Sequence, residues 1–179
     1  MIRYVAFLRA INIGGHGIIK MDGLRKLFEE LDYKNVRTYI QTGNVIFETK
    51  ETNLVSLTKK IEKYLQKSLD YEVDTMLRTI PEIEKIIKEN PFKKTKLDNT
   101  LHMYVTFLHD EPSAELKKLL ISSSNNITTF KIKGREVYTL YKRSNAKHPF
   151  SNNFVEKQLK VPATTRNWNV INKVLETAK

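Results

Sequence analysis

The order in which strand-type and helix-type hydrophobic patterns follow one another is the feature that most constrains how this chain can fold. Strand-type segments cover residues 3–9, 36–41, 45–49 and 71–77, and helix-type segments cover residues 21–31 and 53–65. In the helix-type segments, apolar residues recur every three or four positions and so share one helical face. Thr42-Gly43-Asn44 favours a hairpin between the second and third strands, because glycine and asparagine tolerate positive φ. The resulting order, β-α-β-β-α-β, is the ferredoxin-like pattern.

The second part of the chain repeats much of this order. Strand-type segments cover residues 101–108, 127–132 and 136–142, and helix-type segments cover residues 79–90, 113–122 and 151–159. The last strand of the pattern is missing, and PATTRNW (residues 162–168) followed by a final helix takes its place. We therefore predict an α+β protein of two ferredoxin-like halves with antiparallel sheets. Residues 1–78 form the first half, and residues 79–179 form the second, which adds a linking helix and C-terminal helices. No residue-level repeat is visible, and one mixed sheet is the alternative.

Helix-start signals support these boundaries. Thr79 can cap a helix, Pro81 lies in its first turn, and Glu82 stands three residues after the cap. Asn53 and Ser151 are plausible N-caps of two further helices.

Cysteine and histidine usage excludes several kinds of site. The chain contains no cysteine, which excludes disulfides, thiolate metal sites and cysteine nucleophiles. None of the four histidines shows metal-ligand spacing, so we expect neither a metal nor another cofactor. The N-terminal apolar run is short and is interrupted by Arg3 and Arg9, so it fits neither a signal peptide nor a membrane span. We expect a cytoplasmic protein that does not associate with membranes.

The formal net charge is +11 and is distributed unevenly. Residues 1–78 contain 13 Lys and Arg against 10 Asp and Glu, a net +3, whereas residues 79–179 contain 18 against 10, a net +8. Such a balance favours polyanions or phosphorylated ligands as partners. The alternative is a lysine-rich surface that serves solubility.

A glycine-containing loop follows the first strand. In a ferredoxin-like half, the loop after the first strand and the hairpin between the second and third strands emerge at one end of the sheet. Residues 12–20 should therefore lie beside residues 42–44. Gly14 and Gly15 would expose backbone N–H groups that can hold an anion, and Lys20 would add a positive charge. The spacing matches neither GxxxxGK[ST] nor GxGxxG, so simple loop flexibility is the alternative.

The segment ATTRNWN, residues 163–169, contains a second group of candidate residues. In the predicted topology, the hairpin at Lys133-Gly134 should lie near this segment, at one end of the second sheet. Thr164 or Thr165 can cap the last helix, and Arg166 would stand at the helix start, where the helix dipole disfavours a cation. Free N–H groups, Arg166 and Asn167 could together hold a phosphate or carboxylate. The alternative is a capped helix whose Trp168 fills the core.

Basic and aromatic residues alternate near the second hairpin. Residues 131–166 contain nine Lys and Arg against two Glu, a net +7, and the interleaved aromatic residues are Tyr138, Tyr141, Phe150 and Phe154. Basic strands with aromatic residues are typical of sheets that bind single-stranded RNA. Arg135 nevertheless stands after Gly134 where the RNP1 motif has an aromatic residue, and half or more of these aromatic residues would also suit a core.

Three sequence blocks resemble one known family. They are LRAINIGG (residues 8–15), VRTYIQTGNVIF (36–47) and ATTRNWN (163–169). They are similar to the LRGINVGG, VRTYxQSGNVxF and ATTRNWNT blocks of a widespread bacterial family catalogued as domain of unknown function sixteen-ninety-seven. Ala10 replaces the family glycine, His16 a usual lysine and Thr42 a serine. The resemblance implies no activity, substrate, cofactor or catalytic residue.

The blocks fall on the loops that the predicted topology brings to the sheet ends. We therefore expect a protein that binds an anionic ligand, either nucleic acid or a phosphorylated metabolite, in a cleft between the halves. The predicted ligand-binding residues are Arg9, Asn12, Gly14, Gly15, Lys20, Gln41, Thr42, Gly43, Asn44, Thr165, Arg166, Asn167 and Trp168. A small enzyme acting on a phosphorylated or acylated substrate and a protein-interaction module are the alternatives.

Overall fold

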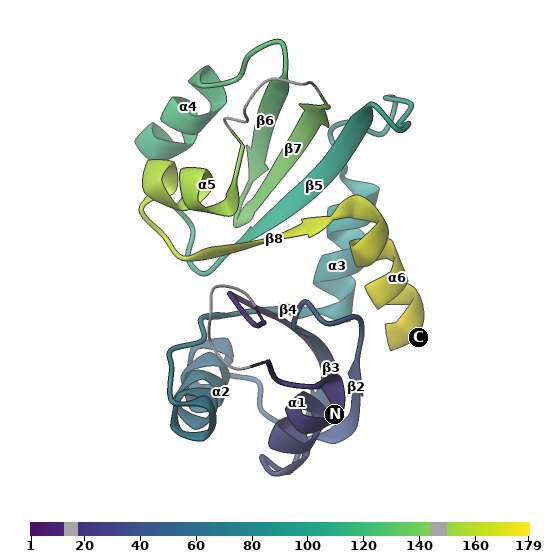
Figure 1. Cartoon of the computed structure of the whole chain (residues 1–179), viewed down its shortest axis with the longest axis vertical. Coiled ribbons are helices and arrows are strands. Elements are labelled where there is room, and N and C mark those ends of the chain that lie inside the picture. The colour runs from purple at the N-terminus through teal and green to yellow at the C-terminus, as the bar shows by residue number, and fades with distance from the viewer. Residues whose placement is uncertain (13–17, 144–149) are drawn as a thin grey trace. The chain divides into compact units, whose positions relative to one another are not determined.

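The computed structural model describes residues 1–12, 18–143 and 150–179. The chain forms two compact units (Figure 1). The first unit contains Met1–Glu84 together with Lys173–Lys179, and the second contains Lys85–Asn172. Each unit has its own four-stranded antiparallel sheet, so the alternative of one mixed sheet is wrong.

The first unit has the predicted ferredoxin-like topology. Its elements are β1 (Ile2–Leu8), α1 (Met21–Glu29), β2 (Lys34–Thr38), β3 (Asn44–Thr49), α2 (Leu54–Leu69) and β4 (Thr75–Thr79), and the strand order is β2-β3-β1-β4. Alternate residues of β1, Tyr4 and Leu8 among them, face α1 and α2 and pack with Phe28 and Ile61 in the core. Both helices therefore cover one face of this sheet (Figure 1).

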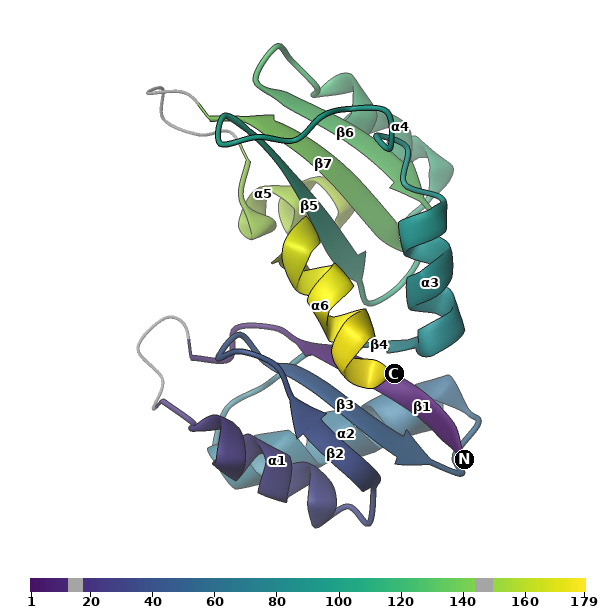
Figure 2. The same ribbon diagram turned by 90° about the vertical axis from the view of Figure 1, so that its right-hand side faces the viewer.

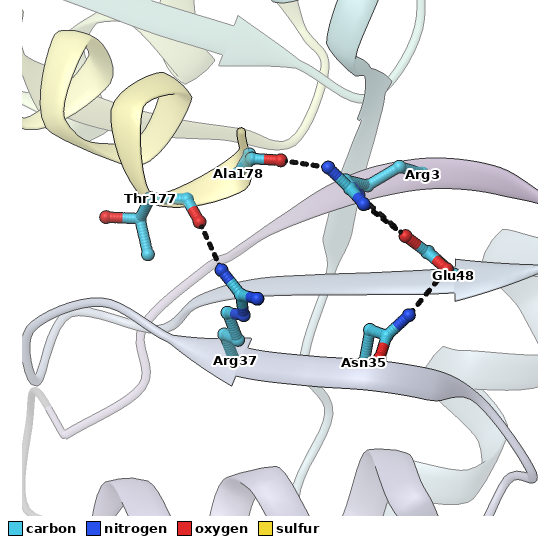
Figure 3. A network of polar contacts seen from close by, with 6 residues as sticks. All are labelled: Arg3, Asn35, Arg37, Glu48, Thr177 and Ala178. Atoms are coloured by element: carbon cyan, nitrogen blue, oxygen red, sulfur yellow. Dashed lines mark hydrogen bonds and ion pairs between the residues drawn. The ribbon is translucent and has the colours of Figure 1, made fainter.

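The C-terminal end of the chain lies on the other face of the first sheet (Figure 2). It is the last part of α6 (Trp168–Ala178). Arg3 of β1 donates to the carbonyl oxygen of Ala178, and Arg37 of β2 donates to that of Thr177 at 3.0 Å. Glu48 of β3 accepts from Arg3 Nε at 2.8 Å (Figure 3). These two arginines satisfy carbonyl groups that the end of a helix leaves without intrahelical donors.

The second unit repeats the topology of the first. Its elements begin in α3 (Ile80–Lys88) and continue with β5 (Leu101–Leu108), α4 (Ala114–Ser122), β6 (Thr128–Lys133), β7 (Glu136–Lys142), α5 (Asn152–Leu159) and β8 (Ala163–Asn167), with strand order β6-β7-β5-β8. The unit ends within α6. Leu108, Phe130, Val137 and Leu159 belong to its core.

The expectation that the second half lacks its last strand is wrong. Residues 163–167 form β8, which pairs with β5 from Leu108↔Ala163 to Tyr104↔Asn167. This strand is short and mostly polar, so it carries little of the apolar alternation by which strands are recognised. Its pairing with a buried central strand determines its conformation, and α6 is the single helix that follows it.

Equivalent backbone contacts close one end of each sheet. The amide of Leu8 donates to Gly43 in the first hairpin at 2.8 Å, and that of Leu108 donates to Arg135 in the second hairpin at 2.9 Å. The two units thus repeat contacts at residue level, although their sequences show no repeat.

The last strands of the two units are also held in the same way. Glu62 of α2 accepts from the Thr75 amide at the start of β4, at 2.8 Å. Glu156 of α5 accepts from the Ala163 amide at the start of β8, at 2.7 Å. In both units, a helix carboxylate therefore satisfies the first backbone donor of the edge strand.

Candidate functional site

Asn12 organises the loop end of the first sheet. Its Oδ1 accepts from the Ile19 amide at 2.8 Å, and its Nδ2 donates to the carbonyl oxygens of Ile19 at 3.0 Å and Gln41 at 3.2 Å. These bonds confirm that the β1–α1 loop and the first hairpin are neighbours. Gly14 and Gly15 of the predicted site lie outside the described residues.

Gly43 and Asn44 shape the hairpin itself. Gly43 has φ +73°, and a Cβ atom there would lie 3.0 Å from Leu8 Cβ, so only glycine fits without displacement. Asn44 is fully buried, and its Nδ2 donates to Tyr39 O and Thr42 Oγ1, both at 2.9 Å. Gly43 therefore permits the backbone conformation of the hairpin, and Asn44 stabilises that conformation through its side-chain hydrogen bonds.

The remaining predicted residues of the first unit are more accessible. Lys20, Gln41 and Thr42 are exposed. Arg9 is about one-third exposed and forms an ion pair of 3.7 Å with Asp74. A ligand could reach these four side chains, although the carboxylate beside Arg9 weakens its attraction for an anion.

The next residue along the chain has unusual backbone geometry. Ala10 has φ +57°. Glycine adopts this left-handed conformation without strain, whereas alanine adopts it at a cost in backbone free energy.

The second group of predicted residues lies in β8 and at the start of α6. Thr165 does not cap α6, because it lies within the strand, where its Oγ1 donates to Asn152 Oδ1 at 3.0 Å. Asn167 Oδ1 instead accepts from the Asn169 amide at 2.9 Å. Trp168 is the half-buried first residue of α6.

Arg166 lies within β8, not at the start of the helix. It is 7% exposed, and its Nη1 donates to Thr164 Oγ1 at 2.7 Å and to Thr165 O at 3.0 Å. Desolvation by burial lowers the pKa of Arg166 to about 10, so the guanidinium remains charged at neutral pH.

Arg78 is the counterpart of Arg166 in the first unit. Arg78 pairs with Val5 of β1 as Arg166 pairs with Val105 of β5. Arg78 is 1% exposed, and its Nη1 donates to Leu77 O at 2.7 Å. A buried arginine therefore occupies the same position in the last strand of each unit.

A basic hollow in the second unit lies outside the predicted residues. We call it the lysine hollow; its volume is about 660 Å³. It is lined by Lys88, Glu89, Asn90, Pro91, Phe92, Lys93, Lys94, Thr95 and Lys133. Four lysines against one glutamate give these lining residues a net charge of +3.

The loop that forms the lysine hollow is held by its own hydrogen bonds. Asn90 is buried, and its Oδ1 accepts from the Phe92 amide at 2.8 Å. The Thr95 amide donates to Phe92 O at 2.8 Å. Lys133 of β6 donates to Glu89 O at 2.8 Å and so ties the loop to the second hairpin. Lys93 and Lys94 are thus presented on an ordered turn.

Another hollow, in the first unit, has the opposite balance. Its volume is about 320 Å³. It is lined by Lys59, Glu62, Lys63, Gln66, Glu72, Val73 and Asp74. Two lysines against three carboxylates give its lining residues a net charge of −1. The positive charge of the lysine hollow is therefore not a simple consequence of the positive net charge of the protein.

The lysine hollow was missed in the sequence because its lining comes from two separated segments. Residues 91–99 read only as a polar loop. The available signal was Lys93-Lys94 directly after Asn90-Pro91-Phe92, within the more basic part of the chain. Lys133 is far from them in the sequence and joins them only in the folded chain, where its Nζ donates to Glu89 O at 2.8 Å.

The described residues contain neither a metal-binding cluster nor a membrane-spanning helix. No group of three or more His, Cys, Asp and Glu that could hold a metal ion occurs among them. Within the same ranges, no helix has both the length and the apolar character needed to cross a membrane.

The two strand orders define an α+β protein built from two ferredoxin-like units. The chain belongs to the family described as Protein of unknown function (DUF1697), whose model matches residues 1–138. It is similar to the solved structure of the conserved bacterial protein SP0830 from Streptococcus pneumoniae, with a TM-score of 0.77, 20% identity and 99% of each chain covered. That likeness shows a shared fold. A comparison with curated proteins gave no match.

Proposed function

We propose that this protein binds a phosphate-bearing anionic ligand, a nucleic acid or a phosphorylated small molecule, at the lysine hollow. The observation that supports this proposal is the gathering of four lysines around one hollow with a single carboxylate. Ammonium groups on several sides of a concave surface add their fields and attract an anion more strongly than scattered surface lysines do.

The order of the loop adds to this attraction. The bonds that fix Asn90, Phe92 and Thr95 keep Lys93 and Lys94 on a turn that does not have to fold when a ligand arrives. Pre-organisation of this kind reduces the entropy that binding costs.

The exposed residues of the first-unit loop end are a second candidate surface for the same ligand class. Lys20, Gln41 and Thr42 are exposed there. The variant Lys20→Ala measures what this surface contributes, because Lys20 caps α1 without a side-chain hydrogen bond and its loss should leave the fold unchanged.

Isothermal titration calorimetry on the full chain tests the proposal. The titrants are single-stranded RNA, single-stranded DNA and nucleotides, at about 20 mM and about 200 mM salt, since phosphate contacts weaken as salt rises. We expect Lys93→Ala/Lys94→Ala to weaken binding by about tenfold or more, the loss of two charge-assisted contacts. No binding at low salt would refute the proposal.

The matched control is Lys59→Ala/Lys63→Ala. It removes the same charge from exposed lysines that line the acidic hollow. At about 200 mM salt, binding should remain close to that of the unmodified protein, because neither lysine lines the lysine hollow and exposed charges that do not contact the ligand are strongly screened at that salt. An equal loss in both double variants would mean that overall charge, and not the lysine hollow, attracts the anion.

A further inference from the structure

The aromatic residues of this protein are buried or partly buried. Among the described residues, which include every Phe, Tyr and Trp of the chain, none of these side chains is exposed. Proteins that bind single strands stack successive bases on accessible aromatic rings, and those rings supply much of the affinity. The described surface therefore offers partly exposed rings, but no fully exposed ring on which a base could stack freely.

The aromatic residues that alternate with basic ones in the sequence are part of this interior. Tyr138 is 1% exposed, and its hydroxyl donates to Ile86 O at 3.1 Å. Phe150 and Phe154 pack on Phe130, with ring centroids 6.0 Å and 5.9 Å away. The pattern that resembles an RNA-binding sheet is therefore explained by core packing.

The lysine hollow itself offers charge without a surface for bases. Its one aromatic lining residue, Phe92, is buried, and Lys131 lies over its ring with Nζ 5.1 Å from the centroid. The side-chain oxygen of Asn90, the one amide side chain in the lining, is already bonded to the Phe92 amide. The positively charged groups in the lining are all ammonium groups, which recognise phosphate oxygens as point charges.

The charge and the volume of the lysine hollow restrict the class of ligand that it can bind. Lys133 is partly satisfied by Glu89, through the bond to its carbonyl oxygen and an ion pair of 3.9 Å. The other lysines of the lining are Lys88, Lys93 and Lys94, and all three are exposed. A phosphate monoester carries a charge of about −1.5 to −2 at pH 7, so a net +3 is better balanced by neighbouring phosphates than by one. The volume of about 660 Å³ lies within the range of small-molecule sites.

We infer that the lysine hollow selects a small molecule with two or more adjacent phosphate groups, and recognises the phosphates without reading a base. This inference rests on the proposed function and specifies its ligand class. Lys88, Lys93 and Lys94 bind the phosphates, while Lys133 and Asn90 hold the loop that presents them.

Calorimetric titration of the full chain with matched probes tests the inference. The probes are tripolyphosphate, ATP, GTP, AMP and a short deoxythymidine strand with as many phosphates as tripolyphosphate. Tripolyphosphate, ATP and GTP should bind within about threefold of one another, and AMP about tenfold more weakly. The strand should bind more weakly than tripolyphosphate, because its phosphates are spaced apart and each carries a single charge.

The variants distinguish failure of the inference from failure of the proposed function. We expect Lys93→Ala/Lys94→Ala to lose about tenfold or more in tripolyphosphate affinity, and Lys59→Ala/Lys63→Ala to keep it. If the strand binds more tightly than tripolyphosphate and the first variant abolishes that binding, the inference is overturned and the proposed function stands. If no probe binds, or if both variants lose affinity equally, both are overturned.

Discussion

Two buried threonines in the second sheet carry a cost that their neighbours do not. Thr128 and Thr139 are fully buried, and their hydroxyls have no hydrogen-bond partner among the described residues. Thr106 is also fully buried, but its hydroxyl bonds to Thr165 Oγ1 at 2.8 Å. A buried hydroxyl without a partner costs about 1–3 kcal/mol in desolvation. The same residue type thus stabilises one position and destabilises another.

The variant Thr139→Val should raise the free energy of unfolding by about 1 kcal/mol, because valine has nearly the same shape and no hydroxyl to desolvate. Thr106→Val is the matched control and should lower it by about 1 kcal/mol, since the hydrogen bond between Thr106 and Thr165 would be lost. Urea unfolding monitored by circular dichroism measures both. A loss of stability in Thr139→Val would show that its hydroxyl is satisfied.

At the scale of elements, the end of α6 is fixed by arginines on neighbouring strands. Arg3 bonds both to the helix end and to Glu48, whereas Arg37 bonds to the helix end alone (Figure 3). Hydrogen bonds from Arg3, and then from Asn35, hold the pKa of Glu48 below its ordinary value of 4.5. Glu48 therefore stabilises the fold above that value, and this contribution is lost as the pH falls through its lowered pKa.

Arg3→Ala should accordingly reduce stability at pH 7 and also reduce the loss of stability between pH 7 and pH 3. Arg37→Ala should lower stability by about 1 kcal/mol, the value of one hydrogen bond, and keep the full acid dependence. Urea unfolding at several pH values compares the two variants. The same acid dependence in both would contradict the role of Arg3 in lowering the pKa of Glu48.

Elements with local signals were predictable and those without were not. The cap at Thr79 is confirmed, since Glu82 accepts from the Thr79 amide at 2.7 Å and the Glu82 amide donates to Thr79 Oγ1 at 3.3 Å. The caps at Asn53 and Ser151 are confirmed as well. β8 was missed because its strand conformation depends on pairing with β5, a contact between residues distant in the sequence.

The two candidate sites also differ in how far they could be predicted from the sequence. Topology was enough to bring Asn12 next to Gln41, because a ferredoxin-like order determines which loops share a sheet end. The lysine hollow depends on a turn after α3 meeting the end of β6, and neither segment has a pattern that indicates the other. Burial of Arg166 was equally hidden, since arginine is seldom found in a core.

At the scale of the whole molecule, the first unit is discontinuous in sequence. It includes Lys173–Lys179, whose Val174 and Ala178 are buried. Deletion of residues 173–179 should therefore lower the hydrogen-exchange protection of β1 and β3 more than that of β5 and β7. Burying valine is worth about 1.5–3 kcal/mol, and Arg3 and Arg37 would also lose their carbonyl partners. An equal loss in both sheets, measured by mass spectrometry, would contradict this division.

This discontinuity has a consequence for synthesis. A ribosome makes the strands and helices of the first unit early, yet the segment that covers the second face of that sheet is translated after the entire second unit. The first unit is therefore the first to begin synthesis and the last to be completed. The helix-end partner of Arg3 is absent until residue 178 has been added. A nascent chain would accordingly expose part of its earliest sheet throughout most of its elongation.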